Sequence, residues 1–413
     1  MRKRVAVTGL GCVTPFGIGR HALFDALLAG RPAVSLISSF DTSDLKTKIA
    51  AEIKDFDPDP YFPKSETRRM DRFTQFAAVA AKDALIDAKI DLNSLDKSRA
   101  GIVLGSGFGG ISTTLEQHKT LLERGAKRVS PFCVPMMIPN MAAGNLAILF
   151  GLRGPNETVC TACASSSHAI AAAFRLIQSG KADLMLCGGS EAPVNPLILA
   201  AFSSMNALSK RNDAPEKASR PFDKERDGFV LGEGAGILIL ESFEHAKARK
   251  ADVYAEIVGA GSSADAFHIT SPDPEGLGAE SAMRAALDDA GITPDKISSV
   301  TAHGTGTVAN DPTETKALKA VFGEHAYKIP VNSIKSMLGH ALGAAAALEA
   351  VSAVSSIVEG VIPPTINLED PDHECDLDYV PNVSRKAELK YVMTDSFGFG
   401  GQNSVLIFKS ANG

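Results

Sequence analysis

The sequence predicts an α/β protein built from two halves of similar design. Short apolar runs alternate with longer helical stretches, an order typical of sheets covered by helices. The order begins again near residue 254, where a strand followed by two glycines repeats the pattern of Val5 to Gly11. At 413 residues, the chain also exceeds what one hydrophobic core usually covers. We expect an N-terminal half over residues 1–250 and a C-terminal half over residues 251–413.

The elements of the first half follow in order along the chain. The first strand, 5–8, is expected to run into a βα turn at Gly9 and Gly11, because glycine often marks a turn. Short buried runs predict the other strands, and apolar periodicity predicts the helices. These are strands at 102–104, 184–189 and 230–240, helices at 21–28, 73–88 and 168–177, and a charged helix at 241–250 that joins the halves.

The second half repeats this order of elements with little sequence identity. Its first strand, 254–258, again ends at two glycines, Gly259 and Gly261. The remaining predicted elements are strands at 297–302 and 404–408 and helices at 280–290 and 334–357. The helix at 334–357 is rich in alanine, like the helix at 168–177. We therefore expect these two helices to take equivalent places in the two halves.

A glycine-rich loop at 105–110 follows the buried strand at 102–104. Such a loop can hold a phosphate when its N–H groups point at the ligand. This loop lacks the lysine of a phosphate-binding loop and the full spacing of a dinucleotide motif. We favour the alternative, that its glycines permit the close approach of a backbone or an acyl chain.

Composition and charge exclude several classes of function. The net charge is −6, so a general nucleic-acid footprint is absent. Six cysteines in so long a chain do not make a disulfide scaffold. The apolar run after the basic start is too short for a signal peptide, and the longest apolar candidate, 341–358, contains Glu349. We expect a soluble, reduced, cytoplasmic protein with no nucleic-acid or membrane partner.

The candidate nucleophile is Cys163, in the stretch Thr161-Ala162-Cys163-Ala164 before an alanine-rich helix. The first turn of a helix has unpaired N–H groups and partial positive charge. The sequence therefore predicts a pKa for the Cys163 thiol below the value of about 8.5 for a free cysteine. The small neighbours leave room for a substrate carbonyl. This stretch alone leaves open the alternative that Cys163 is a small buried hydrophobic residue.

Three downstream residues can complete a site around the thiol. His303 follows a buried strand, and strand ends are where α/β sheets place their sites. Lys335 and His340 stand at the start of the second alanine-rich helix, the place that Cys163 takes in the first half. Glu349 is the candidate counter-charge of Lys335. The alternatives are a histidine that only supports the loop and a lysine that is solvated.

Other chemistries have weaker support in the sequence. Cys160 and Cys163 form a Cys-x-x-Cys pair, but no second pair completes a zinc site, so no metal is expected. A Gly-x-Ser-x-Gly elbow is absent, which argues against a serine hydrolase. The loop 398–401, Gly-Phe-Gly-Gly, can aim N–H groups at a reacting carbonyl as an oxyanion hole does. A plain hairpin turn is the alternative for this loop.

Four motifs together resemble those of the β-ketoacyl-acyl-carrier-protein synthases, and the resemblance spans essentially the whole chain. They are Thr161-Ala162-Cys163-Ala164, His303-Gly304-Thr305, Lys335-Ser336-Met337-Leu338-Gly339-His340 and Gly398-Phe399-Gly400-Gly401. Initiating members of the family carry Asn at the position of His340, so the chain is most similar to synthase II, an elongating enzyme. The resemblance implies a thiolase-like fold of two duplicated halves in five layers, α-β-α-β-α.

The resemblance implies a decarboxylative Claisen condensation in fatty acid elongation, catalysed by an acyltransferase. Cys163 would take an acyl chain from acyl carrier protein as a thioester. Malonyl-acyl carrier protein would then lose CO2, and its carbanion would attack that thioester to give 3-oxoacyl-acyl carrier protein. His303 and His340 would donate hydrogen bonds to the enolate oxygen formed by decarboxylation.

The resemblance gives supporting roles to three further residues. Lys335, paired with Glu349, would order His303 and the local field. The N–H groups of Cys163 and Phe399 would hold the thioester oxygen, and the Phe399 side chain would gate entry to the site. The phosphopantetheine arm would arrive on the carrier protein, so no cofactor of the enzyme's own is expected.

The resemblance also implies two protein partners, acyl carrier protein and a second copy of the chain. The basic cluster of Lys64, Arg68 and Arg69 is expected to dock the acidic carrier protein, in a way that weakens with salt. An ordinary solvated helix start is the alternative for this cluster. Asn206 stands where the family has a basic docking residue, which puts that contact in doubt.

Phe108, Cys133 and Phe202 are expected, by the same resemblance, to line the acyl pocket. Phe108 replaces a branched aliphatic residue and is expected to shorten the accepted primer. Cys133 replaces an aromatic residue and is expected to widen the tunnel near the dimer interface. These two changes oppose each other, so the preferred chain length stays open.

Three alternatives to this function remain. The first is a ketosynthase of a specialised polyketide or polyene pathway, paired with a chain-length factor as a heterodimer. The second is an inert subunit that only shapes a tunnel, which retention of Cys163, His303, Lys335 and His340 disfavours. The third is a degradative thiolase, which needs a second catalytic cysteine near the C-terminus, where 398–401 supplies none.

Overall fold

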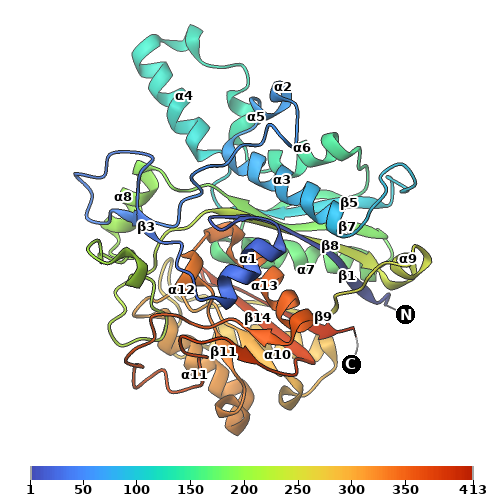
Figure 1. Ribbon diagram of the computed structural model, residues 1–413, viewed down its shortest axis with the longest axis vertical. Coiled ribbons are helices and arrows are strands. Elements are labelled where there is room, and N and C mark those ends of the chain that lie inside the picture. The colour runs from blue at the N-terminus through green and yellow to red at the C-terminus, as the bar shows by residue number, and fades with distance from the viewer. Residues whose placement is uncertain (1, 412–413) are drawn as a thin grey trace.

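Two sheets and three layers of helices make up the protein in the computed structural model, which describes residues 2–411 (Figure 1). Each half contributes one mostly buried sheet, here called the N-sheet and the C-sheet. Helices cover the outer face of each sheet, and two helices lie between them. The thiolase-like arrangement of five layers, expected from the resemblance, is thus confirmed.

Both sheets have the same strand order. From outer edge to shared edge, the N-sheet runs β6, β5, β7, β8, β1 and the C-sheet runs β11, β10, β14, β15, β9. Numbered within each half, both orders are third, second, fourth, fifth, first. The bounds are β1 (Val5–Thr14), β5 (Ala100–Gly105), β6 (Asn156–Val159), β7 (Leu184–Glu191), β8 (Gly234–Ser242), β9 (Ala255–Ala264), β10 (Ser299–Thr301), β11 (Val331–Asn332), β14 (Tyr391–Gly398) and β15 (Gln402–Ser410).

The two sheets are joined at their shared edge. Strands β1 and β9 pair antiparallel, with Val5, Ala6 and Val7 opposite Ile257, Glu256 and Ala255. The hydrogen-bonded surface is therefore continuous from one half to the other. The boundary expected at residue 250 falls in the connection between α9 (Phe243–Ala248) and β9, and its exact position stays a prediction.

The central layer consists of the two alanine-rich helices, α7 (Ser165–Gln178) and α13 (Ala345–Glu359). Each contacts strands of both sheets, and they contact each other. By length and composition, the segment Leu342–Glu359 is apolar enough to cross a membrane, but 89% of it is buried inside the molecule. It therefore serves here as a core helix.

The expected turn at Gly9 and Gly11 is wrong, because β1 continues to Thr14. These glycines lie where α3 (Arg72–Asp87) crosses the strand, and a Cβ at Gly11 would lie 2.1 Å from the Ala80 carbonyl oxygen. Their role is close packing of a helix on a strand. The strand signal was right, but the glycines were misread as its end.

The second half makes the same packing contact. Gly259 and Gly261 lie inside β9, not at its end, under α10 (Leu277–Ala290). A Cβ at Gly261 would lie 2.0 Å from the Ala282 carbonyl oxygen. The glycine pairs of both halves therefore allow the outer helix to pack on the first strand.

The single helix expected at 334–357 is interrupted. A short helix, α12 (Lys335–Leu338), ends at Gly339, whose φ of +65° suits glycine. A 3-10 turn, η6 (Leu342–Ala344), then leads into α13. The interruption leaves His340 on an irregular segment, free of helical geometry.

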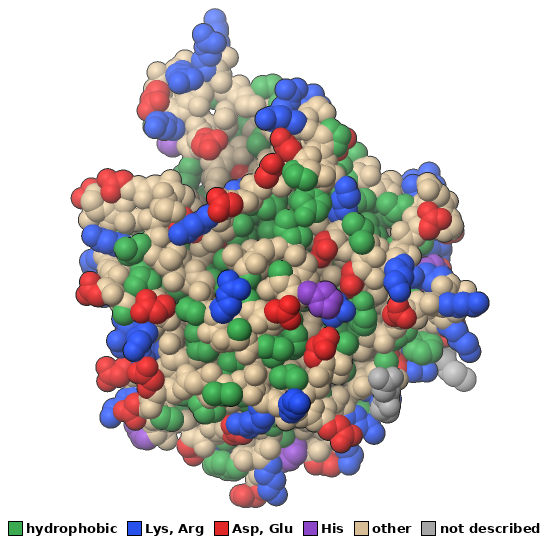
Figure 2. All heavy atoms as spheres, in the orientation of Figure 1, with side chains coloured by type: hydrophobic (Ala, Val, Ile, Leu, Met, Phe, Trp, Pro, Cys, Tyr) green, Lys and Arg blue, Asp and Glu red, His purple; other side chains and the backbone are tan. Residues whose placement is uncertain are grey.

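The other elements surround this frame, and α4 with its connections projects from the body at the top of Figure 1. Figure 2 shows charges of both signs interspersed over this face, with basic side chains at the end of that projection. The remaining helices are α1 (Arg20–Leu28), α2 (Lys64–Thr67), α4 (Ile111–Arg124), α5 (Cys133–Met137), α6 (Met141–Phe150), α8 (Pro196–Ser204) and α11 (Asn310–Phe322). The remaining short elements are β2 (Gly17–Ile18), β3 (Ser35–Leu36), β4 (Ile49–Ala50), β12 (Val361–Ile362), β13 (Arg385–Lys386), η1 (Ala126–Arg128), η3 (Pro215–Lys217), η4 (Pro294–Lys296) and η5 (Gly323–Tyr327).

Candidate active site

Cys163 lies in a tight turn between β6 and the central helix α7. The turn, η2 (Ala162–Ala164), begins with Ala162 at a φ of +49°, which a residue with a Cβ rarely adopts. The Ser165 hydroxyl closes the turn, because it donates to the Ala162 carbonyl (2.6 Å) and accepts from the Thr161 N–H (2.9 Å). This turn is therefore held rigidly, with the thiol at its tip.

The predicted low pKa of the Cys163 thiol is wrong. Burial raises the pKa of Cys163 to about 12, although the Lys335 ammonium and the Phe399 N–H both favour the thiolate. The helix end favours the thiolate, but distant segments build apolar walls around the sulfur. The cost of desolvating the Cys163 thiolate outweighs its favourable interactions with the Lys335 ammonium and the Phe399 N–H.

His303 follows β10 on a loop and is held by Lys335. The Lys335 ammonium lies 3.4 Å from Nδ1 of His303 and donates to its carbonyl oxygen at 2.6 Å. On its other side, Lys335 forms a buried ion pair with Glu349, as the sequence predicted. Because an ammonium can only donate, Nδ1 of His303 accepts, and the ring proton lies on Nε2.

His340 has no hydrogen-bond partner at either ring nitrogen, although both nitrogens are buried. Its backbone N–H donates to the Val230 carbonyl at 2.7 Å, which fixes the residue against the segment before β8. Its ring makes an edge contact with the ring of His303, with centroids 5.4 Å apart. A buried imidazole without a partner is suited to receive one from a substrate.

Both imidazoles are neutral at physiological pH. Burial lowers the pKa of His303 well below its usual value, and Lys335 and His340 lower it further. Burial and the Lys335 ammonium do the same to the pKa of His340. Each ring therefore offers one N–H donor and one nitrogen acceptor.

A pair of buried carboxyl groups, which the sequence analysis missed, supports the His303 loop. Glu314 and Asp395 both accept from the His303 N–H at 2.7 Å, and Glu314 also accepts from the Gly304 N–H at 2.8 Å. Burial and mutual repulsion raise the pKa of Glu314, and burial raises the pKa of Asp395 to about 7. Their only sequence signal was an acidic residue in an otherwise buried helix or strand.

One cavity of about 520 Å³ brings the candidate residues together. Its walls include Cys163, His303 and His340. The expected pocket residues Phe108 and Phe202 also line it, with their rings in edge contact at 6.4 Å between centroids. The thiol thus faces a space shared with both imidazoles and with an apolar wall.

Phe399 lies on the loop between β14 and β15, at the same cavity. Its N–H is directed at the Cys163 sulfur, and its ring packs on Phe202 with centroids 6.3 Å apart. Gly398 makes the approach possible, because a Cβ there would lie 2.6 Å from the Thr161 carbonyl oxygen. The loop therefore brings an N–H donor beside the candidate nucleophile.

Thr305 and Thr307 are cavity residues to which the sequence alone assigned no role. Their hydroxyls are 3.0 Å apart, and both residues line the cavity. Asn206 also lines it, and its side-chain oxygen accepts from Lys210 at 3.2 Å. These groups add polar side chains to a cavity wall that also contains aromatic rings.

The other predicted residues lie outside the cavity wall. Cys133 begins α5 and is partly exposed, away from the residues that line the cavity of the single chain. Lys64, Arg68 and Arg69 are exposed on and after α2, and their role as a docking cluster stays a prediction. Arg69 also lies over the ring of Phe132, 5.0 Å from its centroid.

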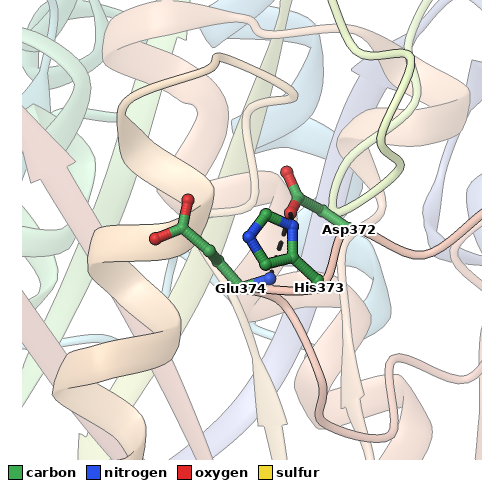
Figure 3. Close-up of side chains that lie close together, drawn as sticks. All are labelled: Asp372, His373 and Glu374. Atoms are coloured by element: carbon green, nitrogen blue, oxygen red, sulfur yellow. Dashed lines mark hydrogen bonds and ion pairs between the residues drawn. The ribbon is translucent and has the colours of Figure 1, made fainter.

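Figure 3 shows Asp372, His373 and Glu374, three neighbouring residues whose ligand atoms lie close together. The Asp372 carboxylate is already occupied, because it accepts from Arg226 at 2.6 Å and contacts His373 Nδ1 at 3.0 Å. The other two side chains are exposed. The group is therefore best explained as part of the ion-pair network around Arg226.

Comparison with known proteins supports one family. Residues 2–246 match the model of the β-ketoacyl synthase N-terminal domain, and residues 254–369 match that of the C-terminal domain. The chain is 51% identical over 408 residues to 3-oxoacyl-[acyl-carrier-protein] synthase 2 of Synechocystis sp., covering 99% of this chain and 98% of that protein.

Solved structures agree with these matches. One is a type II polyketide acyl-carrier protein in complex with its ketosynthase, which matches with a TM-score of 0.91 and 35% identity over 100% of both chains. Another is the ishigamide ketosynthase/chain length factor, with a TM-score of 0.91 and 37% identity over 99% of this chain and 100% of that one.

Proposed function

Because the chain belongs to the β-ketoacyl synthase family, we propose that it condenses an enzyme-bound acyl thioester with malonyl-acyl carrier protein in fatty acid elongation. The product is 3-oxoacyl-acyl carrier protein, and the loss of CO2 drives the reaction. The observation that carries the proposal is the single cavity shared by Cys163, His303 and His340. These residues supply the nucleophile and the two hydrogen-bond donors that the reaction needs.

In the first step, the acyl group moves from the carrier's phosphopantetheine to Cys163. A bond forms between the sulfur and the acyl carbon, and the carbon–sulfur bond to the carrier breaks. Because the pKa of the thiol is raised to about 12, the proton must leave as the sulfur attacks. A neutral imidazole in the cavity can accept that proton, and the departing pantetheine thiolate then takes it up.

In the second step, malonyl-acyl carrier protein loses CO2 and leaves an enolate. The Nε2–H of His303 and one ring N–H of His340 stabilise the developing oxyanion. The enolate carbon then attacks the thioester, so a carbon–carbon bond forms and the bond to Cys163 breaks. The N–H groups of Cys163 and Phe399 hold the thioester oxygen during this attack. The expelled Cys163 thiolate then takes a proton from solvent, which restores the thiol for another cycle.

We further infer that the carrier protein docks on the basic cluster of Lys64, Arg68 and Arg69. Exposed positive charge attracts an acidic partner, and a patch is sufficient although the whole chain is net negative. Thr305 and Thr307 can hydrogen-bond the amide groups of the phosphopantetheine arm. The reaction needs no further cofactor or metal, and we expect it to take place in the cytoplasm.

A homodimer is the proposed assembly, with β6 at its centre. This strand ends the N-sheet, so its outer edge can pair with another strand. Exposed apolar side chains lie on the neighbouring α5 and α6 segments, with Val134 57% exposed and Ile148 77% exposed. Pairing at this edge would bury these apolar side chains against a second copy of the chain. In the polyketide alternative, it would bury them against a chain-length factor.

The test is to weigh the products of the pure protein with acyl carrier proteins that bear acyl chains of graded length, plus malonyl carrier protein. Condensation to 3-oxoacyl products with the protein alone supports elongation by a homodimer. Activity that appears only after a chain-length factor is added would support the polyketide alternative. Acylation without condensation in both settings would contradict both proposals.

A further inference from the structure

Glu191 is a fully buried carboxylate that has no place in the proposed chemistry. It ends β7, and its side chain does not line the cavity. Instead it lies directly behind the loop 106–109, which carries Phe108 into the cavity wall. Its position makes it the link between the core of the N-sheet and the aromatic wall of the pocket.

Four donors from both halves of the protein converge on this carboxylate. One oxygen accepts from the Ser106 hydroxyl at 3.0 Å and the Phe108 N–H at 3.1 Å. The other accepts from the Gly107 N–H at 2.6 Å and the Gly343 N–H at 3.1 Å. Ser106 in turn accepts from the Gly109 N–H at 3.0 Å. The loop is thereby tied through one side chain to η6, the turn before α13.

Backbone hydrogen bonds hold the two ends of this loop: the Ser106 N–H donates to the Val159 carbonyl at 3.2 Å, and the Gly110 N–H donates to the Met137 carbonyl at 3.0 Å. Two of the loop's four residues are glycine, and Gly109 has a φ of +61°. A Cβ at Gly343 would lie 2.4 Å from the Glu191 carboxylate and 2.6 Å from the Gly107 N–H, so the contact is close-packed. In the middle of the loop, the N–H groups of Gly107 and Phe108 both donate to the Glu191 carboxylate, so the backbone that carries the Phe108 ring depends on that group.

We propose that Glu191 is a positioning residue that limits the length of acyl chain accepted by the cavity, because it holds the Phe108 ring against Phe202. This proposal rests on the proposed function, and it adds a determinant of substrate length that does not touch substrate. Loss of the carboxylate frees the loop, the ring moves off Phe202, and longer chains enter.

The decisive variant is Glu191→Gln, which keeps the volume of the side chain. Whichever way the amide turns, its NH2 faces at least one backbone N–H of the loop or of Gly343, so a hydrogen bond is lost. Losing a hydrogen bond to a charged group typically changes an equilibrium by about tenfold or more. We expect the preference for long over short primers, measured as a ratio of kcat/KM, to rise by about tenfold.

The preference is measured with the full-length protein and acyl carrier proteins bearing saturated chains of increasing length. Glu191→Gln is compared with Phe108→Ala and with the double variant. If Glu191 acts through the ring, then Glu191→Gln shifts the preference in the native background but adds nothing when Phe108 is alanine. Equal shifts in both backgrounds would overturn the proposal.

The matched control is Glu233→Gln, which changes another buried glutamate that accepts a backbone N–H, that of Ile53, but does not contact the Phe108 loop. It should lower stability without changing the length preference. A folded Glu191→Gln variant with an unchanged preference would overturn the proposal. If Glu191→Gln does not fold, then Ser106→Ala, which removes one of the four donors, must shift the preference in the same direction, and no shift overturns it.

A second measurement separates this proposal from the proposed function. Acyl transfer to Cys163 from small acyl thioesters of graded length, followed by intact mass, needs only the thiol and the cavity. If the wild type acylates but makes no 3-oxoacyl product, then the proposed function fails. The proposal for Glu191 is tested even in that case, because it requires Glu191→Gln to change how the rate of Cys163 acylation depends on acyl-chain length.

Discussion

The Nζ atom of Lys335 lies 3.4 Å from Nδ1 of His303 and 2.6 Å from the carbonyl oxygen of the same residue. One ammonium thus fixes the ring and the backbone of His303 at once. It also sets the tautomer, so that the ring proton points away from the lysine. Glu349 balances the charge, since it forms the buried ion pair with Lys335.

We predict that Lys335→Met lowers both stability and condensation. Removing one partner of a buried ion pair leaves Glu349 uncompensated, which costs about 3–5 kcal/mol. Without the ammonium, the His303 tautomer is no longer fixed, and condensation should fall by about 10²-fold or more. Thermal unfolding and product mass spectrometry measure the two effects. The exposed Lys386→Met is the control, and equal losses in both variants would contradict the assigned role.

The roles of the nucleophile and the two imidazoles can be separated by step. Cys163→Ala should abolish acyl transfer, because it removes the thiol that shares the cavity with both imidazoles and faces the Phe399 N–H. His303→Ala and His340→Ala should retain more acyl transfer than condensation, since each removes an enolate donor typically worth about 10²–10³ in rate. Intact mass after exposure to acyl carrier protein measures acylation, and product mass measures condensation. Equal collapse of acylation in all three variants would refute these roles.

The raised pKa of Cys163 gives a prediction for pH. Below its pKa, the thiolate fraction of a thiol rises tenfold for each unit of pH, so alkylation accelerates as pH increases. With a pKa of about 12, the rate of Cys163 alkylation should still be rising at pH well above the value of about 8.5 for a free cysteine. Iodoacetamide labelling followed by mass spectrometry measures this rate. If the alkylation rate instead reached a plateau below pH 8, the helix end would determine the pKa of Cys163 more strongly than burial does.

The docking cluster can be tested by charge reversal. The triple variant with Glu at the positions of Lys64, Arg68 and Arg69 should raise KM for acyl carrier protein while kcat changes little, because these residues lie outside the cavity. The effect should shrink as salt increases, since exposed charges are screened. The control is Lys386→Glu, which reverses one exposed charge at a site away from α2 and should leave KM unchanged. An unchanged KM at low salt would exclude this surface.

The order of elements was predictable, but the meaning of several residues was not. Gly9 and Gly11 carry the same local signal whether they end a strand or admit a helix, and only the position of α3 decides between them. Cys163 was found from the turn before an alanine-rich helix. Its pKa could not be predicted, because burial by distant segments opposes the local effect of the helix end.

The pairing of Lys335 with Glu349 was predictable from their spacing near one helix. The carboxylates that hold the loops were not. Glu314 lies 11 residues after its donor His303, but no motif links the two positions. The donors of Glu191 lie far away in sequence. A buried acidic residue at the end of an apolar strand was the only local hint. Such residues are found by asking where the N–H groups of a glycine-rich loop are satisfied.

The turn that presents Cys163 has a counterpart in the other half, and the two are not interchangeable. Leu342 opens η6 with a φ of +48°, as Ala162 opens η2 with +49°, so Gly343 takes the place of the cysteine. A side chain there would collide with Glu191. The two halves thus share one turn geometry, but only the turn in the N-terminal half has room for a cysteine side chain. In the C-terminal half, the same position is Gly343, whose N–H donates to Glu191. Two halves of nearly the same structure therefore form one asymmetric reaction centre.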